Sequence, residues 1–234
     1  MIEIEDLLVR FASADQNFSV NIARLILKNG EAVFLFGPSG SGKTTILNAV
    51  AGLIGRRKLV SDNPFSLGYV MHSSTLLPWL TIEGNILVEQ ALRKKKIDYS
   101  QLFKLLDEFG LSDNIMNQKP RRLSFGMKQR IEIAKALAFD VGLLMMDEAL
   151  SGIDENNKGN VILALDSYLR ERQGIILSIT HDIVDLSRLA DRVIKIRDGS
   201  VQGEIRLNVE RAERSGANSF DAINKLNIKE LLAS

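Results

Sequence analysis

The sequence has no cysteine among its 234 residues. This absence excludes disulfide bonds, zinc–thiolate and iron–sulfur sites, and a thiol nucleophile. The sequence also has almost no excess of one charge, because 30 Lys and Arg residues face 29 Asp and Glu residues. A formal net charge of +1 argues against a protein that follows a nucleic-acid backbone or binds membranes through a basic patch. We therefore expect no nucleic-acid partner.

Long hydrophobic runs are missing as well. None approaches the roughly 18 to 20 apolar residues that a membrane-spanning helix needs. The first residues, MIEIEDLL, carry acids where a secretory signal would carry basic residues, so we expect no export signal. Hydrophobic residues make up 45% of the chain, which is ordinary globular usage. We expect a cytoplasmic globular protein that would reach a membrane only through a partner.

Three short apolar runs are nearly continuous, at residues 33–36, 142–146 and 174–179. Strands that are buried on both faces have this pattern, as in a parallel sheet. Segments with apolar residues at helical spacing lie between the runs, as at residues 102–109. The alternation predicts an α/β fold.

Three other regions interrupt this alternation. Residues 2–11 are typical of a separate, antiparallel β layer at the N-terminus. Residues 192–207 predict a hairpin that turns at Asp198 and Gly199. From residue 73 to about residue 124 the strand patterns stop and helical patterns dominate, which predicts a helical subdomain inserted into the sheet domain.

The chain is therefore expected to divide into three parts. The parts are an α/β core with its β layer at 1–72 and 131–207, a helical subdomain at 73–130, and a C-terminal tail of no assigned role at 208–234. This division places the helical subdomain between two halves of one sheet domain.

A glycine-rich loop follows the first apolar run directly. The segment GPSGSGKT, residues 37–44, lies between that run and a helical segment at 45–53. Glycines let backbone N–H groups point at phosphate oxygens, and the helix N-terminus adds partial positive charge. Lys43 would reach the β- and γ-phosphates, and Thr44 would offer its hydroxyl to Mg²⁺. The predicted nucleotide-binding residues are Gly37, Pro38, Ser39, Gly40, Ser41, Gly42, Lys43, Thr44 and Thr45.

Polar side chains end the other two apolar runs. Asp147 and Glu148 would lie at the carboxyl end of a central strand, where α/β sheets bind ligands. Asp147 would hold Mg²⁺, and Glu148 would polarise the attacking water. The alternative is that both acids only cap the following turn. The third run is followed by His181, which we expect to donate to the γ-phosphate; the only other histidine is His72.

Taken in order, these motifs resemble those of the ATP-binding subunits of ABC transporters. The segment LSFGMKQR, residues 123–130, resembles the signature motif of that family, and it precedes the Asp-Glu pair. The segment SGID, residues 151–154, resembles the D-loop, and LADRV, residues 189–193, resembles the segment after the switch histidine. The resemblance covers residues 1 to about 205.

The resemblance implies a RecA-like P-loop NTPase core and a Mg²⁺-dependent ATPase. Two such domains would pair head to tail around two ATP molecules. Each ATP would touch the P-loop of one subunit and Ser124 with Gly126 of the other, and Asp154 would belong to the D-loop. Phe11 falls near the place where the family stacks an aromatic ring on adenine. Phe18 is the alternative, and a plain core role stays open for either.

The resemblance also implies partners and a location. The partners would be membrane-spanning subunits docked near the helical subdomain, a second ATP-binding subunit that is identical or a diverged sibling, and a solute-binding protein. The chain would lie at the cytoplasmic face of the cell membrane. The segment TLLPWLT, residues 75–81, resembles the subgroup that imports nitrate, sulfonates and taurine. Two alternatives are a soluble ABC ATPase in an assembly process and a weakly hydrolysing ATP-binding scaffold.

Two positions depart from the family pattern. His72 stands where the family has its Q-loop glutamine, and imidazole is a poorer Mg²⁺ ligand than an amide oxygen. We expect weaker metal sensing there, with coupling to the partner retained; the alternative is that His72 faces solvent without a role. Phe125 replaces the first glycine of the signature motif, while Gly126 is kept. We expect a slow enzyme rather than an inactive one.

Overall fold

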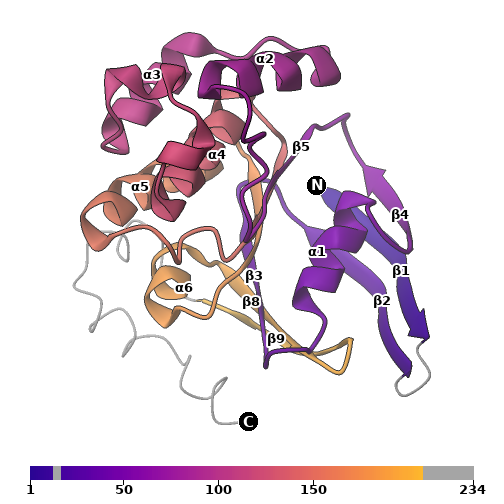
Figure 1. The fold of residues 1–234 in the computed structure, drawn as a ribbon. Coiled ribbons are helices and arrows are strands. Elements are labelled where there is room, and N and C mark those ends of the chain that lie inside the picture. Colours follow the sequence, from indigo (N-terminus) through magenta and orange to yellow (C-terminus); the bar gives the residue numbers. More distant parts are fainter. Residues whose placement is uncertain (13–16, 208–234) are drawn as a thin grey trace.

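The computed structural model describes residues 1–12 and 17–207, and the tail predicted at 208–234 lies outside the described residues. The described chain forms two sheets and a group of helices (Figure 1). The strands are β1 (Ile2–Ala12), β2 (Asn17–Leu27), β3 (Ala32–Phe36), β4 (Arg56–Ser61), β5 (Leu67–Val70), β6 (Leu143–Asp147), β7 (Ile175–Ile179), β8 (Arg192–Arg197) and β9 (Ser200–Arg206). The helices are α1 (Lys43–Ala51), α2 (Ile82–Arg93), α3 (Tyr99–Glu108), α4 (Phe125–Ala138), α5 (Glu155–Glu171) and α6 (Ile183–Leu189), with short 3₁₀ turns η1 (Asp113–Asn117) and η2 (Pro120–Arg122).

The smaller sheet has the order β2-β1-β4, and both of its pairings are antiparallel. Alternate residues of β1 and β2 are buried, and they pack with α1 and with one face of the larger sheet. This is the N-terminal β layer that the sequence predicts. Helix α1 lies between the two sheets (Figure 1), so the helix that follows the glycine-rich loop is held from both sides.

The larger sheet has the order β5-β6-β7-β3-β8-β9. Its first five strands are parallel, and β9 returns antiparallel to β8. The turn between them uses Asp198 and Gly199, both with positive φ (49° and 72°), as a two-residue hairpin turn requires. The predicted hairpin is confirmed. Strands β6, β7 and β3 are neighbours, so the segments that follow them meet at one edge of the sheet.

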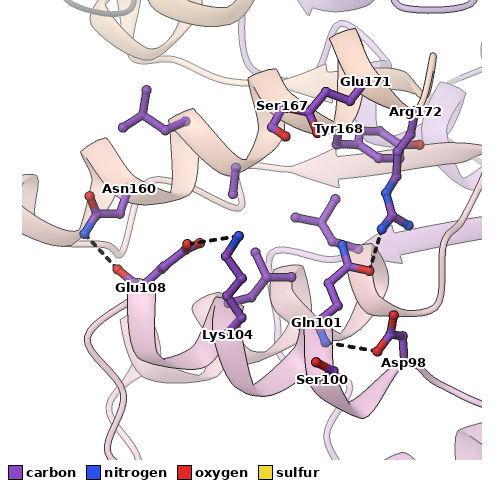
Figure 2. Close-up of a pocket in the computed structure, with 14 residues that line it drawn as sticks. Asp98, Ser100, Gln101, Lys104, Glu108, Asn160, Ser167, Tyr168, Glu171 and Arg172 are labelled. Carbon is purple, nitrogen blue, oxygen red and sulfur yellow. Dashed lines mark hydrogen bonds and ion pairs between the residues drawn. The ribbon is translucent and has the colours of Figure 1, made fainter.

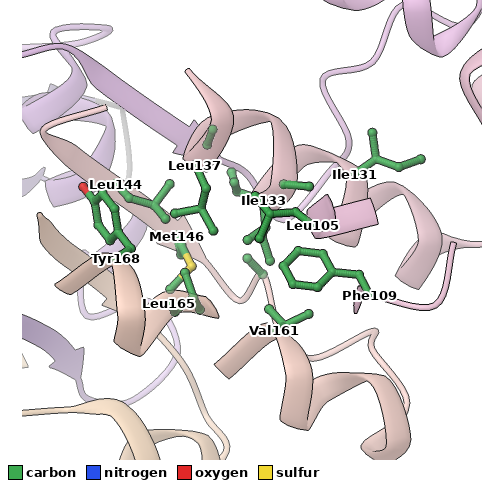
Figure 3. Packing of buried hydrophobic residues seen from close by; sticks show 14 of the residues in the cluster. Leu105, Phe109, Ile131, Ile133, Leu137, Leu144, Met146, Val161, Leu165 and Tyr168 are labelled. Atoms are coloured by element: carbon green, nitrogen blue, oxygen red, sulfur yellow. The ribbon is translucent and has the colours of Figure 1, made fainter. Parts of the chain in front are cut away.

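The helices α3, α4 and α5 enclose a hydrophobic core on the other face of the sheet (Figure 3). Each large side chain that is fully buried there contributes about 1.5 to 3 kcal/mol to folding. Residues from four elements meet in this core: Leu105, Ile133, Leu137, Leu144, Met146, Val161, Leu165 and Tyr168.

The region predicted as a helical subdomain contains α2, α3, both 3₁₀ turns and the first residues of α4. Helix α4 runs without a break through the predicted boundary between residues 130 and 131. The limits of the subdomain therefore stay a prediction. Within residues 1–12 and 17–207, no helix is both long enough and apolar enough to span a bilayer.

Candidate active site

The glycine-rich loop connects β3 to α1. Gly42 caps α1 in the left-handed region, with φ 99°, and no side chain caps the helix. Gly37 has φ 155°, and a Cβ there would lie 2.1 Å from the carbonyl oxygen of Ile196. The hydroxyl of Ser41 is buried and has no hydrogen-bond partner within the described part of the chain. A glycine-lined loop with an unpaired hydroxyl at a helix N-terminus that lacks a side-chain cap fits the phosphates of a nucleotide.

Lys43 lies across this loop. Its Nζ donates to the carbonyl oxygens of Gly37 and Pro38, both at 2.8 Å. The side chain is nearly buried, and burial lowers the pKa of its ammonium group, while Glu148 and Asp147 act in the opposite direction. The ammonium therefore donates to neutral carbonyls. A bound phosphate would offer it a stronger, charge-assisted hydrogen bond instead.

Asp147 ends β6 beside the start of α1. Its carboxylate accepts a hydrogen bond from Thr44, while burial raises the pKa of Asp147. Both groups are hard oxygen ligands of the kind that Mg²⁺ prefers. Among the described residues no cluster of three or more His, Cys, Asp or Glu side chains could hold a metal ion. The pair fits a Mg²⁺ site that is completed by phosphate oxygens and water, since Mg²⁺ usually keeps several waters.

Glu148 has a constrained backbone. Its φ is 53°, in the left-handed region that is uncommon outside glycine. Its N–H donates to the carbonyl oxygen of Ile179 at 3.0 Å, and its carbonyl accepts from the amide and hydroxyl of Ser151 at 3.1 Å and 2.8 Å. Because strained conformations persist only where neighbours over-determine them, these bonds aim the Glu148 side chain from the end of β6.

Two imidazole rings face the Glu148 carboxylate. His181 Nε2 lies 3.0 Å from its Oε1, and His72 Nδ1 lies 3.7 Å from its Oε2. The sequence places Glu148 and His181 together, but it gives no sign that His72 faces the same carboxylate. The His72 side chain is 63% exposed and still makes this contact, so it does not simply point into solvent.

Lys158 on α5 fixes the segment after His181. Its Nζ lies 3.4 Å from Asp182 and 3.2 Å from Asp185, at the start of α6. Burial raises the pKa of Asp185 to about 6, against the effect of Lys158. Sequence reasoning missed Lys158, because a lysine on an amphipathic helix gives no sign that it is buried.

A cavity of about 240 Å³ opens over the glycine-rich loop. It is lined by loop residues together with Glu148, His181 and Phe18. Phe11 does not line it; its ring stacks on that of Phe18, with centroids 6.4 Å apart. The alternative aromatic residue, Phe18, is therefore the better placed of the two, and the adenine contact predicted for Phe11 stays a prediction.

The residues predicted to reach a second nucleotide lie apart from this cavity. Ser124 caps α4 and accepts from the N–H of Met127 at 3.2 Å. Asp154 caps α5 in the same way. A Cβ on Gly126 would lie 2.2 Å from the carbonyl oxygen of Gly152, so the signature and D-loop segments are in contact. Ser124, Gly126 and Asp154 do not line the cavity over the glycine-rich loop, and their contact with a partner's ATP stays a prediction.

A cavity of about 580 Å³ lies between α3 and α5 (Figure 2). Several of its polar groups pair with one another: Lys104 with Glu108, Asn160 with the carbonyl of Glu108, and Arg172 with Gln101. None of the predicted site residues lines it. Size alone therefore does not locate the active site.

Comparison with known proteins decides the family. A family model described as ABC transporter matches residues 20–151. The chain belongs to the ABC transporter family. It is 32% identical, over 218 residues, to an aliphatic sulfonates import ATP-binding protein of Albidiferax ferrireducens, and the match covers 87% of this chain and 77% of that protein. This confirms the family resemblance.

The chain spans only about half the length of several other relatives. A molybdenum import ATP-binding protein of Mesorhizobium japonicum is 30% identical over 74% of the chain, but the match spans 51% of that protein. Among solved structures, a dimeric bacterial ABC transporter cassette superposes with a TM-score of 0.79 at 25% identity, covering 90% of this chain and 100% of that one. The predicted P-loop NTPase fold and nucleotide binding are confirmed, whereas the residue roles stay predictions.

Proposed function

We propose that this chain hydrolyses Mg²⁺-ATP to drive solute import through membrane-spanning subunits. The observation that carries the proposal is the Glu148 carboxylate, which is held by His181 at 3.0 Å where both line the cavity over the phosphate loop. A general base must be within reach of the water that it activates. The relatives named as import ATP-binding proteins support the transport role.

The proposed reaction divides its tasks among five side chains and the loop. Loop N–H groups and Lys43 bind the phosphates. Thr44 and Asp147 would hold Mg²⁺, whose positive charge would offset that of the phosphate oxygens. Glu148 accepts a proton from the water whose oxygen bonds to the γ-phosphorus, while the bond from that phosphorus to the β–γ bridging oxygen breaks. His181 donates to a γ-phosphate oxygen. ADP and phosphate leave.

A second cassette completes the site in this proposal. Ser124 and Gly126 of one subunit would face the γ-phosphate bound by the other, with Asp154 beside the shared boundary. Their separation from the P-loop cavity of their own chain supports this arrangement. So does the likeness to a dimeric cassette. The second subunit is an identical chain or a diverged sibling.

The membrane-spanning subunits are proposed to dock on α2. A groove of about 270 Å³ is lined by α2, α4 and the segment before α2, including Leu77, Asn85 and Leu92. Leu92 is 79% exposed, and Trp79 nearby in the sequence is 63% exposed. Exposed apolar groups around a groove are typical of protein interfaces. We place the chain at the cytoplasmic face of the membrane and propose a small organic solute or an anion as the cargo, delivered by a solute-binding protein.

The hydrolytic part is tested by Glu148→Gln. We expect the variant to keep ATP binding, measured by calorimetry, and to lose turnover by about 100-fold or more, the usual scale for removing a general base. Equal turnover of the variant and the parent chain would contradict the role of Glu148. A parent chain that binds ATP without turnover would favour the scaffold alternative.

The transport part is tested by copurification from gently solubilised native membranes. We expect a multi-span protein in near-equal amount, and we expect Leu92→Glu to abolish its recovery. Phe103→Glu is the matched control, because Phe103 is similarly apolar, 51% exposed and on α3. Recovery with soluble partners only would contradict transport and favour the assembly alternative.

A further inference from the structure

We propose that His72 is a positioning residue for Glu148 and that Phe125 holds the His72 ring in place. The inference rests on the hydrolytic role proposed above and extends it to the two positions that depart from the family pattern. In the structure these two positions touch each other within one chain. Their ring centroids are 5.9 Å apart and their planes are tilted by 59°.

The two histidines together constrain the rotation of the Glu148 carboxylate. His181 lies at Oε1 and His72 at Oε2, at 3.0 Å and 3.7 Å. A single contact leaves a carboxylate free to swing about its terminal torsion, which is broad and shallow. A second group beside the other oxygen narrows that freedom. The base is then oriented before water arrives, and orientation of this kind lowers activation barriers.

The Phe125 ring is itself confined. It packs against Gly152, where a Cβ would lie only 2.2 Å from Cδ1 of Phe125. The ring also contacts that of His72. Although Phe125 is 40% exposed, its ring contacts both of these residues. A glycine at position 125 would leave one side of the His72 ring without support.

Helix α4 also holds the backbone that carries His72. Gln129 Nε2 donates to the His72 carbonyl oxygen at 3.4 Å. Glu132 Oε1 accepts from the amide and hydroxyl of Thr75, at 2.7 Å and 2.6 Å. Phe125 is the first residue of the same helix. The ring contact and both backbone anchors therefore come from one rigid element, so a shift of α4 would move His72 relative to Glu148.

The contact can be measured in the nucleotide-free chain. Histidine labelled with ¹³C at Cε1 gives two signals in the untagged protein, because the chain has only His72 and His181. We expect Phe125→Leu to shift the His72 signal by removing a ring current. We expect Glu148→Gln to shift both signals. Phe103→Leu, which removes another half-exposed ring on α3, is expected to shift neither.

The kinetic consequence is tested at saturating and limiting ATP. We expect His72→Ala to lower kcat by about fivefold with KM for ATP unchanged, because the contact orients a base and binds no substrate. His72→Asn keeps a donor near the position of Nδ1 and is expected to recover most of kcat. Phe125→Leu is expected to lower kcat by about twofold, and to have no further effect in the His72→Ala background.

Different results would contradict the His72 proposal and the proposed function. Additive kinetic effects of His72→Ala and Phe125→Leu would overturn the proposed coupling. An unchanged His72 signal in Phe125→Leu or in Glu148→Gln would overturn it without any reference to catalysis. Absence of ATP turnover in the parent chain would instead contradict the proposed function, and the labelled-histidine spectra would still decide whether His72 is held between Phe125 and Glu148.

Discussion

The N-termini of α1 and α4 are both predicted to face phosphate, but they are built differently. At α1 the cap is Gly42, and no side chain occupies the first N–H groups. At α4 the hydroxyl of Ser124 already accepts from the N–H of Met127. The first N-terminus presents backbone donors directly, whereas the second presents a side chain that is engaged in its own helix.

The difference shows how much each site depends on its neighbours. The α1 loop takes its shape mainly from glycine torsions and from the bonds of Lys43 to Gly37 and Pro38, with one close backbone approach from Ile196. The N-terminus of α4 packs against Gly152 and His72, which come from distant segments of the chain. Changes at α1 should therefore act mainly on nucleotide binding, and changes at α4 on turnover and packing.

The largest effect is expected for Lys43→Ala. The variant loses the ammonium group. In the parent chain this group donates to two loop carbonyls, and we expect it to donate to phosphate when ATP binds. We expect ATP binding to weaken by about 100-fold, which corresponds to one or two charge-assisted hydrogen bonds. Calorimetric titration with ATP measures it. Lys95→Ala, at an exposed lysine after α2, is the control. Equal losses of ATP affinity in both variants would contradict a specific role for Lys43 in binding phosphate.

Gly37→Ala should disturb the same loop through its shape. A Cβ at Gly37 would lie 2.1 Å from a backbone oxygen, at φ 155°. We expect the free energy of unfolding to fall by about 2 to 4 kcal/mol. At Gly40 the φ is 79° but a Cβ would meet nothing within 4 Å, so Gly40→Ala should cost only about 1 kcal/mol. Denaturant unfolding that ranks these variants in reverse would contradict the geometry.

Gly126→Ala is the corresponding change at α4. A Cβ there would lie 2.2 Å from the carbonyl oxygen of Gly152. We expect a loss of about 1 to 3 kcal/mol in unfolding free energy and a fall in turnover, with ATP affinity of the isolated chain unchanged. Gly159→Ala on α5 has open space around the new Cβ and should stabilise the chain by about 0.5 to 1 kcal/mol. A loss of ATP affinity in Gly126→Ala would contradict the expectation that changes at α4 spare nucleotide binding.

The smallest effect is expected for Ser124→Ala. Loss of the cap should lower the unfolding free energy by about 1 kcal/mol. Thr81→Ala removes the equivalent cap of α2, where the hydroxyl accepts from Gly84 at 3.1 Å, and should cost about the same. Only Ser124→Ala should also slow ATP turnover. If thermal unfolding and turnover change equally in both variants, Ser124 acts as a cap alone.

Sequence reasoning succeeded where local patterns and structure coincide. The apolar runs became β3, β6 and β7 because strands of a parallel sheet that is covered on both faces have nearly continuous apolar sequences. The hairpin at Asp198 and Gly199 followed from its turn residues. The helical boundary at residue 130 stays a prediction, because α4 continues through it. The adenine ring contact also stays open, since β1 and β2 place Phe11 and Phe18 side by side.

The sequence alone determined the family, the α/β fold, and the order of the phosphate loop, Asp147, Glu148 and His181. Those features are local, because turn torsions, strand burial patterns and loop chemistry depend on residues that are neighbours in the sequence. Tertiary structure alone decided that His72 faces Glu148, that Phe125 packs on His72, and that Lys158 anchors the segment after His181. These contacts join segments distant in the chain, and only packing of the sheet and helices brings such side chains together.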